Sequence, residues 1–223
     1  MPSIKRKLIK NYNILLKHFG PQYWWPGDSD WEIMIGAVLT QNTAWSNVSK
    51  AIENLKKARS LNFNKFINLP KKELETLIRP AGYFRQKSKY LKILANHIKS
   101  KYKGSLELLF NKNLIDLRIE LLNIKGIGEE TADSIILYAG KKPIFVVDAY
   151  TKRILQRWGI KISKKYSGIQ HLFHKNLPKN VKLFNEYHAL LVALGKFFCK
   201  PKPICKACPI KSCTYIKQNL YNK

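Results

Sequence analysis

Residues 117–140 read LRIELLNIKGIGEETADSIILYAG, and this segment restricts the possible folds more than any other part of the chain. Apolar residues recur at helical spacing on both sides of two glycines, Gly126 and Gly128. Glycine accepts backbone conformations that other residues avoid, so the pair predicts a tight turn between two short helices. The apolar positions are Leu117, Leu121 and Ile124 before the turn and Ala132, Ile135, Ile136 and Ala139 after it.

Helical patterns also dominate the rest of the chain. Residues 45–55 are apolar at helical spacing behind Thr43, a suitable N-cap. Further helices are predicted over 71–78, which follows a proline, and over the basic segment 86–100. The best candidate for a strand is PIFVV, residues 143–147. The sequence therefore predicts an all-α fold.

The charge of the chain indicates its kind of partner. The 223 residues include 41 Lys and Arg but 14 Asp and Glu, a formal net charge of +27, while 45% are hydrophobic, as in globular proteins. Binding to phosphates releases counterions and favours such a basic surface, so we expect a nucleic acid partner. Two glycines at a helix start also let backbone N–H groups approach a phosphate, although a plain helix–helix turn has the same pattern. The candidate DNA-binding residues of this segment are Lys125, Gly126, Gly128 and Thr131.

Other classes of protein fit the sequence less well. A membrane-spanning helix needs about 18 or more consecutive apolar residues, and the chain has no such run, so no membrane partner is expected. The first residues, MPSIKRKLIK, lack the apolar centre of a signal peptide, and we expect a cytoplasmic protein.

The frame LLNIKGIGEETA resembles the helix-hairpin-helix of the DNA glycosylases related to endonuclease III. In that superfamily the hairpin is followed by a loop containing Gly and Pro and then by a catalytic aspartate. This chain offers Gly140, Pro143 and then Asp148 in VVDAY. The resemblance implies that Asp148 is catalytic. Its position also suits the N-cap of a helix over 149–158, and the two roles are compatible.

Glu130 departs from one branch of this superfamily. Members that also cut the DNA backbone carry a lysine two residues after the second hairpin glycine, where its amine forms a Schiff base with the sugar. Glu130 stands at that catalytic position here, and a carboxylate cannot form the adduct. The resemblance thus implies a monofunctional glycosylase. Whether Lys125 or Lys141 substitutes for the missing amine stays open.

The segments WWPG, GAVLTQNT and RPAGYFRQKSKYL resemble the endonuclease III-type 3-methyladenine DNA glycosylases, and this resemblance covers residues from about 20 to 160. It implies a stacking pocket for a flipped base, in which a cationic alkylated base gains a cation–π attraction. The implied pocket residues are Trp24, Trp25, Pro26 and Trp45. A core-anchor role for the paired tryptophans is the structural alternative.

Further DNA contacts are expected near this pocket. By resemblance, Gln41 probes the gap left by the flipped base, with Asn42 beside it; a helix C-cap is the alternative for both. Tyr83 follows a glycine turn and can wedge into a duplex, or it can close the turn as a buried aromatic. Arg85 and Lys87 are interpreted as phosphate contacts or solvated charges. His188 is assigned to helix packing, with no catalytic role.

Four cysteines close to the end of the chain predict a metal site. They are Cys199, Cys205, Cys208 and Cys213, spaced C-x5-C-x2-C-x4-C. In a reducing compartment such a set indicates a [4Fe–4S] cluster or zinc rather than disulfides. Endonuclease III relatives hold their [4Fe–4S] cluster with C-x6-C-x2-C-x5-C, which resembles this run with two loops one residue shorter. The resemblance implies a structural [4Fe–4S] cluster, with zinc as the alternative.

Together these observations predict an all-α, two-lobed helix-hairpin-helix DNA glycosylase fold with a C-terminal [4Fe–4S] loop over 199–213. One domain is expected over 21–136, a helical barrel ending in the hairpin, and a second over 1–20 plus 137–223, with DNA across the cleft between lobes. The expected function is that of a monomeric base-excision repair enzyme, which hydrolyses the N-glycosidic bond of a 3-methyladenine-type base flipped out of damaged double-stranded DNA. The alternatives are a bifunctional enzyme for oxidised pyrimidines, a thymine or uracil mismatch glycosylase, and a structure-specific DNA-binding protein without catalysis.

Overall fold

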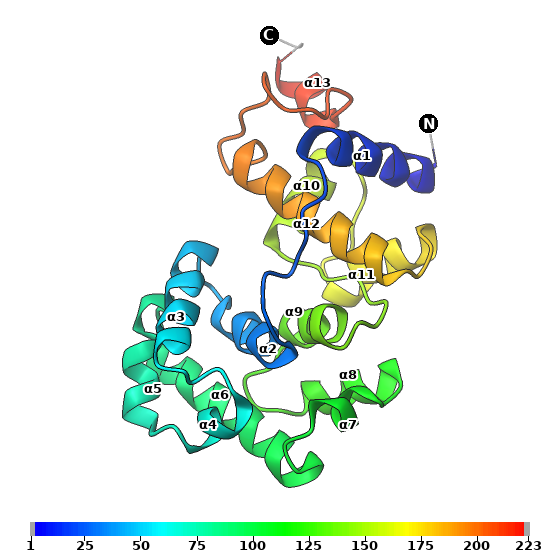
Figure 1. The fold of residues 1–223 in the computed structure, drawn as a ribbon. Helices are drawn as coiled ribbons and strands as arrows, with labels where there is room; N and C mark the ends of the chain where they lie inside the picture. The colour runs from blue at the N-terminus through cyan, green and yellow to red at the C-terminus, as the bar shows by residue number, and fades with distance from the viewer. Residues whose placement is uncertain (1–2, 221–223) are drawn as a thin grey trace. The chain divides into compact units, whose positions relative to one another are not determined.

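The computed structural model describes residues 3–220, and its helices divide between two compact units (Figure 1). The hairpin unit spans residues 25–142, and the cysteine unit joins residues up to Trp24 to those from Pro143 onward. The unit borders lie a few residues past the domain borders expected from the sequence. Every regular element among the described residues is helical, which confirms the all-α fold class. None of these helices is both long and apolar enough to cross a membrane.

The hairpin unit is built around α2, Asp30–Leu39. Its sequence DWEIMIGAVL is apolar on nearly every face, and every residue from Trp31 to Leu39 is buried, as expected for a helix surrounded by others. It packs against α3, α6, α9 and η2. The other elements are α3 Trp45–Lys57, α4 Phe63–Asn68, α5 Lys71–Leu77, the 3-10 helix η1 Arg79–Ala81, α6 Phe84–Tyr102, α7 Leu106–Phe110, α8 Leu114–Leu122, α9 Glu129–Ser134 and the π-helical segment η2 Ile135–Ala139.

The cysteine unit has a similar centre in α12, Val181–Phe197, in which Tyr187 to Gly195 are all buried. It packs against α1 and α10, beside which it runs in Figure 1. Gly195 permits the close approach to α10, because a Cβ there would lie 2.2 Å from the ring of Tyr150. The other helices are α1 Ile4–Phe19, α10 Ala149–Arg157, α11 Tyr166–Asn176 and α13 Thr214–Leu220.

Two local predictions are wrong, while the helices expected over 71–78 and 86–100 are present as α5 and α6. Thr43 does not cap α3, because Ala44 holds the N-cap position and no side chain caps it. The Thr43 hydroxyl instead donates to Ala81 O at 2.6 Å. The Thr43 hydroxyl also accepts from Lys87 Nζ, so its hydrogen bonds are made to other parts of the unit and not to the first turn of α3.

Residues 143–147 form no strand: they have no regular structure, and residues 144–147 are buried. Side chains of α11 satisfy its backbone groups in place of a neighbouring strand. Gln170 Nε2 donates to Phe145 O at 2.8 Å, and Phe145 N–H donates to His174 Nε2 at 3.0 Å. The apolar β-branched run therefore marks burial, which a strand and a buried loop share.

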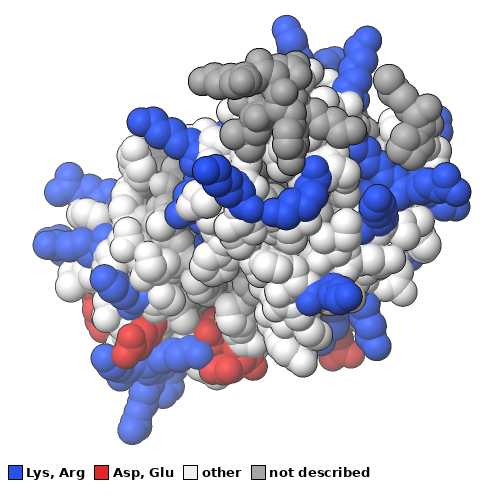
Figure 2. Space-filling view, turned by 90° about the horizontal axis from the view of Figure 1, so that it is seen from above, with Lys and Arg blue, Asp and Glu red and all other residues white. Residues whose placement is uncertain are grey.

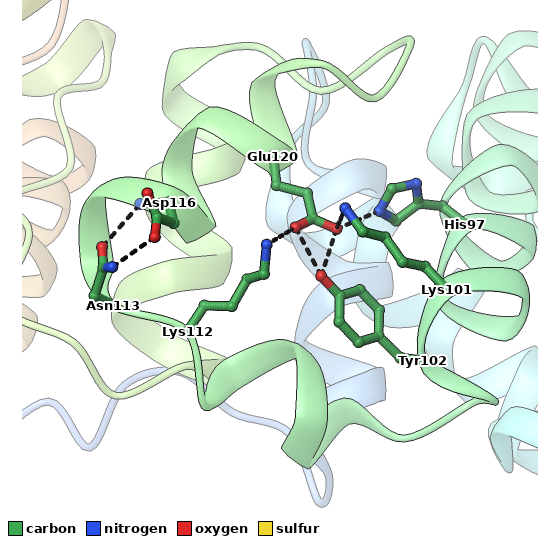
Figure 3. Close-up of polar contacts among 7 residues, drawn as sticks. All are labelled: His97, Lys101, Tyr102, Lys112, Asn113, Asp116 and Glu120. Carbon is green, nitrogen blue, oxygen red and sulfur yellow. Dashed lines mark hydrogen bonds and ion pairs between the residues drawn. The ribbon is translucent and has the colours of Figure 1, made fainter.

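Glu120 of α8 anchors the hairpin unit's main polar network (Figure 3). Its carboxylate accepts hydrogen bonds from Tyr102 at 2.6 and 2.7 Å, lies 2.7 Å from His97 Nε2 and 3.1 Å from Lys101 Nζ, and also contacts Lys112. Burial alone raises the pKa of Glu120, but the hydrogen bonds from its four neighbours outweigh burial and lower the pKa to about 2. The network ties α8 to the end of α6.

Candidate functional site

The hairpin consists of α8, α9 and the turn over residues 123–128. Arg118 of α8 clamps it to α9, because its Nε lies 2.7 Å from Asp133 Oδ1 and its second nitrogen 3.3 Å from Oδ2. Asp133 is fully buried, so this paired contact is a strong one. The turn is therefore presented by two helices that are fixed to each other.

The surroundings of the two hairpin glycines differ. Gly126 has φ +94°, and a Cβ there would lie 2.2 Å from ring carbons of Tyr90, so both conformation and space require glycine. Gly128 is exposed, and a Cβ there would meet no atom within 4 Å. Lys125 beside them is exposed. The turn thus has an open backbone surface with a cation next to it.

Gln41, just after α2, is joined to the hairpin. Its Nε2 donates to Gly126 O and to Thr131 Oγ1, both at 2.9 Å. Thr131 is buried, so its hydroxyl supports Gln41. Thr40 holds the C-cap position of α2, so the C-cap interpretation of Gln41 and Asn42 is wrong. Asn42 is exposed with φ +51°, at the tip of the same loop.

Lys87 is not a surface phosphate contact, and this expectation is contradicted. It is 2% exposed, and its ammonium donates to Leu39 O at 2.8 Å, Thr43 Oγ1 at 2.6 Å and Ala81 O at 2.9 Å. Burial lowers the pKa of Lys87 to about 8. The Lys87 ammonium therefore joins the loop after α2 to the 3-10 helix η1.

Tyr83 and Arg85 lie at the start of α6 and remain accessible. Tyr83 is 73% exposed with φ +44°, so the buried-aromatic alternative is wrong for this residue. Arg85 is exposed, and its guanidinium lies 5.8 Å from the ring centroid of Phe84, which is itself half-buried. The loop thus presents one aromatic ring and one cation to solvent.

An aromatic cluster forms around Trp25 in the hairpin unit. The Trp25 ring lies 5.3 Å from that of Trp45 and 5.1 Å from that of Tyr138, between ring centroids. Gly36 makes room for it, since a Cβ there would lie 3.0 Å from the Trp25 indole nitrogen. Pro26 is exposed beside it. Sequence reasoning missed Tyr138, which lies on η2, and π-helical turns are frequent at functional sites.

Trp24 belongs to the cysteine unit, so the border between the units runs between the paired tryptophans. Asn185 Nδ2 donates to Trp24 O at 2.6 Å, and the Trp24 ring centroid lies 5.6 Å from that of His188. Both tryptophans are half-buried. Their packing therefore differs, although they are neighbours in sequence.

Asp148 is the N-cap of α10, as the sequence predicts. It is 8% exposed; Oδ1 accepts from Thr151 N–H at 2.7 Å, and Oδ2 lies 3.6 Å from His188 Nε2. Burial raises the pKa of Asp148, but His188 and Thr151 outweigh it and hold the pKa below its usual value. The carboxylate is thus buried yet ionised at neutral pH. Sequence reasoning missed His188, for which a polar ring in the apolar run YHALLVALG was the available signal.

Glu130 is exposed in the first turn of α9. An acid in the first turn of a helix is stabilised by the positive end of the helix dipole. Stabilisation of α9 therefore explains an acidic residue at position 130 without any catalytic role.

The four cysteines lie around the end of α10. Arg157 donates to Cys199 Sγ at 3.2 Å and to Lys200 O at 2.6 Å, and Cys213 Sγ donates to Arg157 O at 3.1 Å. Burial raises the pKa of the Cys208 thiol to about 11, and the other three cysteines add to the rise. Within residues 3–220, no three Cys, His, Asp or Glu side chains are already arranged as ligands of a metal ion.

Comparisons with known proteins agree with this geometry. Residues 35–179 match the family described as HhH-GPD superfamily base excision DNA repair protein. A protein of Methanocaldococcus jannaschii, named as a candidate DNA repair glycosylase, is 47% identical over 92% of this chain and 94% of its own length. The structure of the H. pylori 3-methyladenine DNA glycosylase MagIII bound to 1,N6-ethenoadenine is similar, with a TM-score of 0.76 and 32% identity over 87% of this chain and 98% of that one.

The fold is also that of endonuclease III. A non-covalent endonuclease III–DNA complex matches with a TM-score of 0.83 and 23% identity, over 99% of this chain and 100% of that one. This match covers both units. The chain therefore belongs to the HhH-GPD superfamily of base excision DNA repair proteins.

Proposed function

We propose that this protein is a monofunctional DNA glycosylase that hydrolyses the N-glycosidic bond of a 3-methyladenine-type base in damaged double-stranded DNA. The observation that carries the proposal is Asp148, a buried carboxylate held in its ionised form at the position where the superfamily has its catalytic aspartate. Glu130 at the lysine position of the lyases supports the absence of backbone cleavage.

Asp148 acts on the sugar in this mechanism. As the glycosidic bond breaks, positive charge develops on the sugar, and a fixed carboxylate in a dry site stabilises that charge more than water does. The carboxylate also orients the attacking water. A cationic alkylated base is already a good leaving group, so no general acid has to protonate it.

The aromatic side chains hold the flipped base. The rings of Trp25 and Trp45, with the exposed Pro26 beside them, are expected to stack on the base, and a cationic base is attracted to such faces. The buried ring of Tyr138 packs against Trp25 and supports it. The similarity to a 3-methyladenine DNA glycosylase supports an alkylated adenine as the substrate.

The DNA backbone binds to the exposed turn and its cations. Lys125, Arg85 and the N–H groups at Gly126 and Gly128 contact phosphates, while Tyr83 wedges into the duplex. Gln41 and Asn42 fill the gap left by the flipped base. Lys and Arg side chains are spread over the face drawn in Figure 2, where acidic side chains gather at one edge, so this face also attracts a polyanion.

We propose that the four cysteines hold a [4Fe–4S] cluster, which the resemblance of their spacing to that of endonuclease III relatives supports. Arg157 of α10 contacts two of them, because its guanidinium donates to Cys199 Sγ and its carbonyl accepts from Cys213 Sγ. Cys199, Cys205, Cys208 and Cys213 would hold the cluster, which when bound cross-links the basic segment over 199–213 and supplies no redox step to base excision. Iron and sulfide analysis with the visible absorbance of the purified protein distinguishes this cluster from zinc.

Trp25→Ala is expected to lower base release about 10- to 100-fold, the range that corresponds to loss of one stacking partner. Single-turnover release from methylated duplex DNA measures the effect. Trp25→Phe is the matched variant, because it keeps a ring in the cluster and should keep most of the rate. A folded Trp25→Ala protein with the wild-type rate would remove Trp25 from the pocket.

Borohydride treatment with abasic DNA should trap no covalent complex, because Glu130 cannot form a Schiff base. Strands should stay intact until alkali is added. An endonuclease III enzyme treated in parallel serves as the positive control. A trapped complex would contradict the monofunctional assignment and favour the bifunctional alternative, and Lys125→Gln and Lys141→Gln variants would then identify the amine.

A further inference from the structure

A buried histidine faces the proposed catalytic carboxylate within the cysteine unit. Asp148 Oδ1 is engaged by the backbone of α10, through Thr151 N–H at 2.7 Å. Oδ2 is directed to His188, with 3.6 Å to Nε2. His188 is 4% exposed and Asp148 8%. The two oxygens of Asp148 thus have different partners, one from its own helix and one from α12.

We propose that His188 is a positioning residue for Asp148: its Nε2 holds the Oδ2 oxygen in the orientation that base excision requires and favours the ionised carboxylate. This inference rests on the proposed function, since it assigns a role in the same reaction. His188 touches neither base nor sugar in this scheme and acts through Asp148.

The surroundings of His188 fix its ring. The Trp24 ring lies over it with 5.6 Å between centroids and an interplanar angle of 35°, and the Phe145 ring stands perpendicular at 6.5 Å. Asn185, one turn earlier on α12, donates to Trp24 O and so fixes the backbone of that residue against α12. The close contact of Gly195 with Tyr150 sets α12 against α10, which carries Asp148 at its start. Helix α12 therefore carries His188 and also binds the backbone of Trp24.

The chemistry of a buried carboxylate explains the need for this partner. A carboxyl group removed from water favours its neutral form, which cannot stabilise a cationic sugar. A single backbone hydrogen bond from Thr151 leaves Oδ2 to be satisfied from elsewhere. The distance of 3.6 Å is longer than a direct hydrogen bond, and catalytic contacts of this kind tighten when substrate binds.

Other titratable groups near the pair are engaged in bonds of their own. Tyr166 of α11 accepts from Val147 N–H, His174 of α11 from Phe145 N–H, and Glu186 of α12 from Gln22 N–H, while the Tyr187 hydroxyl donates to Leu8 O of α1. The contact with Oδ2 is made by His188.

Two substitutions separate positioning from packing. His188→Phe keeps the ring volume but loses the donor, so single-turnover release should fall about 10- to 100-fold, the range for losing one hydrogen bond to a charged group. His188→Gln keeps a nitrogen donor at the same reach and should stay within about threefold of wild type. DNA affinity should be unchanged in both. The acid limb of the rate–pH profile should move to higher pH in the Phe variant, because its carboxylate protonates more readily.

His174→Gln is the matched control, because it alters another ring-stacked histidine of this unit and keeps an acceptor for Phe145 N–H. Its rate and acid limb should equal those of wild type. If His188→Phe does not fold, His188→Asn replaces it, since its shorter amide cannot reach Oδ2, and the same loss is expected.

The outcomes are distinguishable from those for the proposed function. An active wild type, an inactive Asp148→Asn and a His188→Phe protein with unchanged rate and acid limb would overturn the role of His188 and leave the proposed function intact. Equal losses of rate in His188→Phe and His188→Gln would also contradict the positioning role, because they would show that His188 acts through packing. A wild type that releases no base from any lesion would overturn both.

Discussion

Asp148→Asn should abolish base release almost completely, with a loss of at least about 100- to 1,000-fold, while the protein still folds and binds DNA. Asparagine has nearly the same shape and is as good an N-cap residue, so α10 keeps its start. It carries no charge to stabilise the cationic sugar. Single-turnover release of the damaged base measures the loss, with DNA affinity and thermal melting measured on the same samples.

Asp116→Asn is the matched control for this result. Asp116 is an exposed acid in the first turn of α8, so its replacement removes the same charge at a comparable helix position. Its rate should equal that of wild type. Unchanged turnover in a folded Asp148→Asn protein would remove the aspartate from the chemistry.

Glu120 should contribute about 3 kcal/mol to folding stability at neutral pH, because its pKa is about 2 in the folded protein and 4.5 when unperturbed. A folded-state pKa below the unfolded value means that this stability is fully present above about pH 4.5. It is lost as pH falls toward 2, where the folded carboxylate also takes up a proton. Denaturant titrations between neutral and acidic pH measure the change.

Glu120→Gln should remove most of that contribution and flatten this part of the pH dependence. It replaces a buried carboxylate that accepts hydrogen bonds from Tyr102 and from the more exposed Lys101 and Lys112, and hydrogen bonds to a charged group are stronger than those to a neutral one. Glu107→Gln removes the same charge from an exposed position on α7 and should change stability little. Equal stability losses in the two variants would show that net charge rather than the network stabilises the fold.

Much of the fold follows from local patterns. The paired glycines identify the hairpin because Gly126 has a positive φ, a conformation of the local backbone that favours glycine. Asp148 precedes a clear helical pattern, and its N-cap role follows from that alone. These features depend on neighbours within one or two turns of chain, which a sequence displays directly.

Roles that depend on distant partners could not be read in the same way. Lys87 lies in a basic helix, and nothing in its neighbours tells that its ammonium is buried against Leu39 and Ala81 carbonyls. Tyr138 and His188 sit in apolar runs that predict only burial. Their contacts with Trp25 and Asp148 are made by tertiary packing.

Release of free base from methylated duplex DNA by the wild-type protein tests the proposed function most directly. The protein is incubated with DNA carrying 3-methyladenine, and in parallel with oxidised pyrimidines and with thymine or uracil opposite guanine; free bases are quantified and strands are examined with and without alkali. We predict free 3-methyladenine and strand cleavage only after alkali. The proposed function would be contradicted if 3-methyladenine stayed in the DNA, whether the protein released another base or no base.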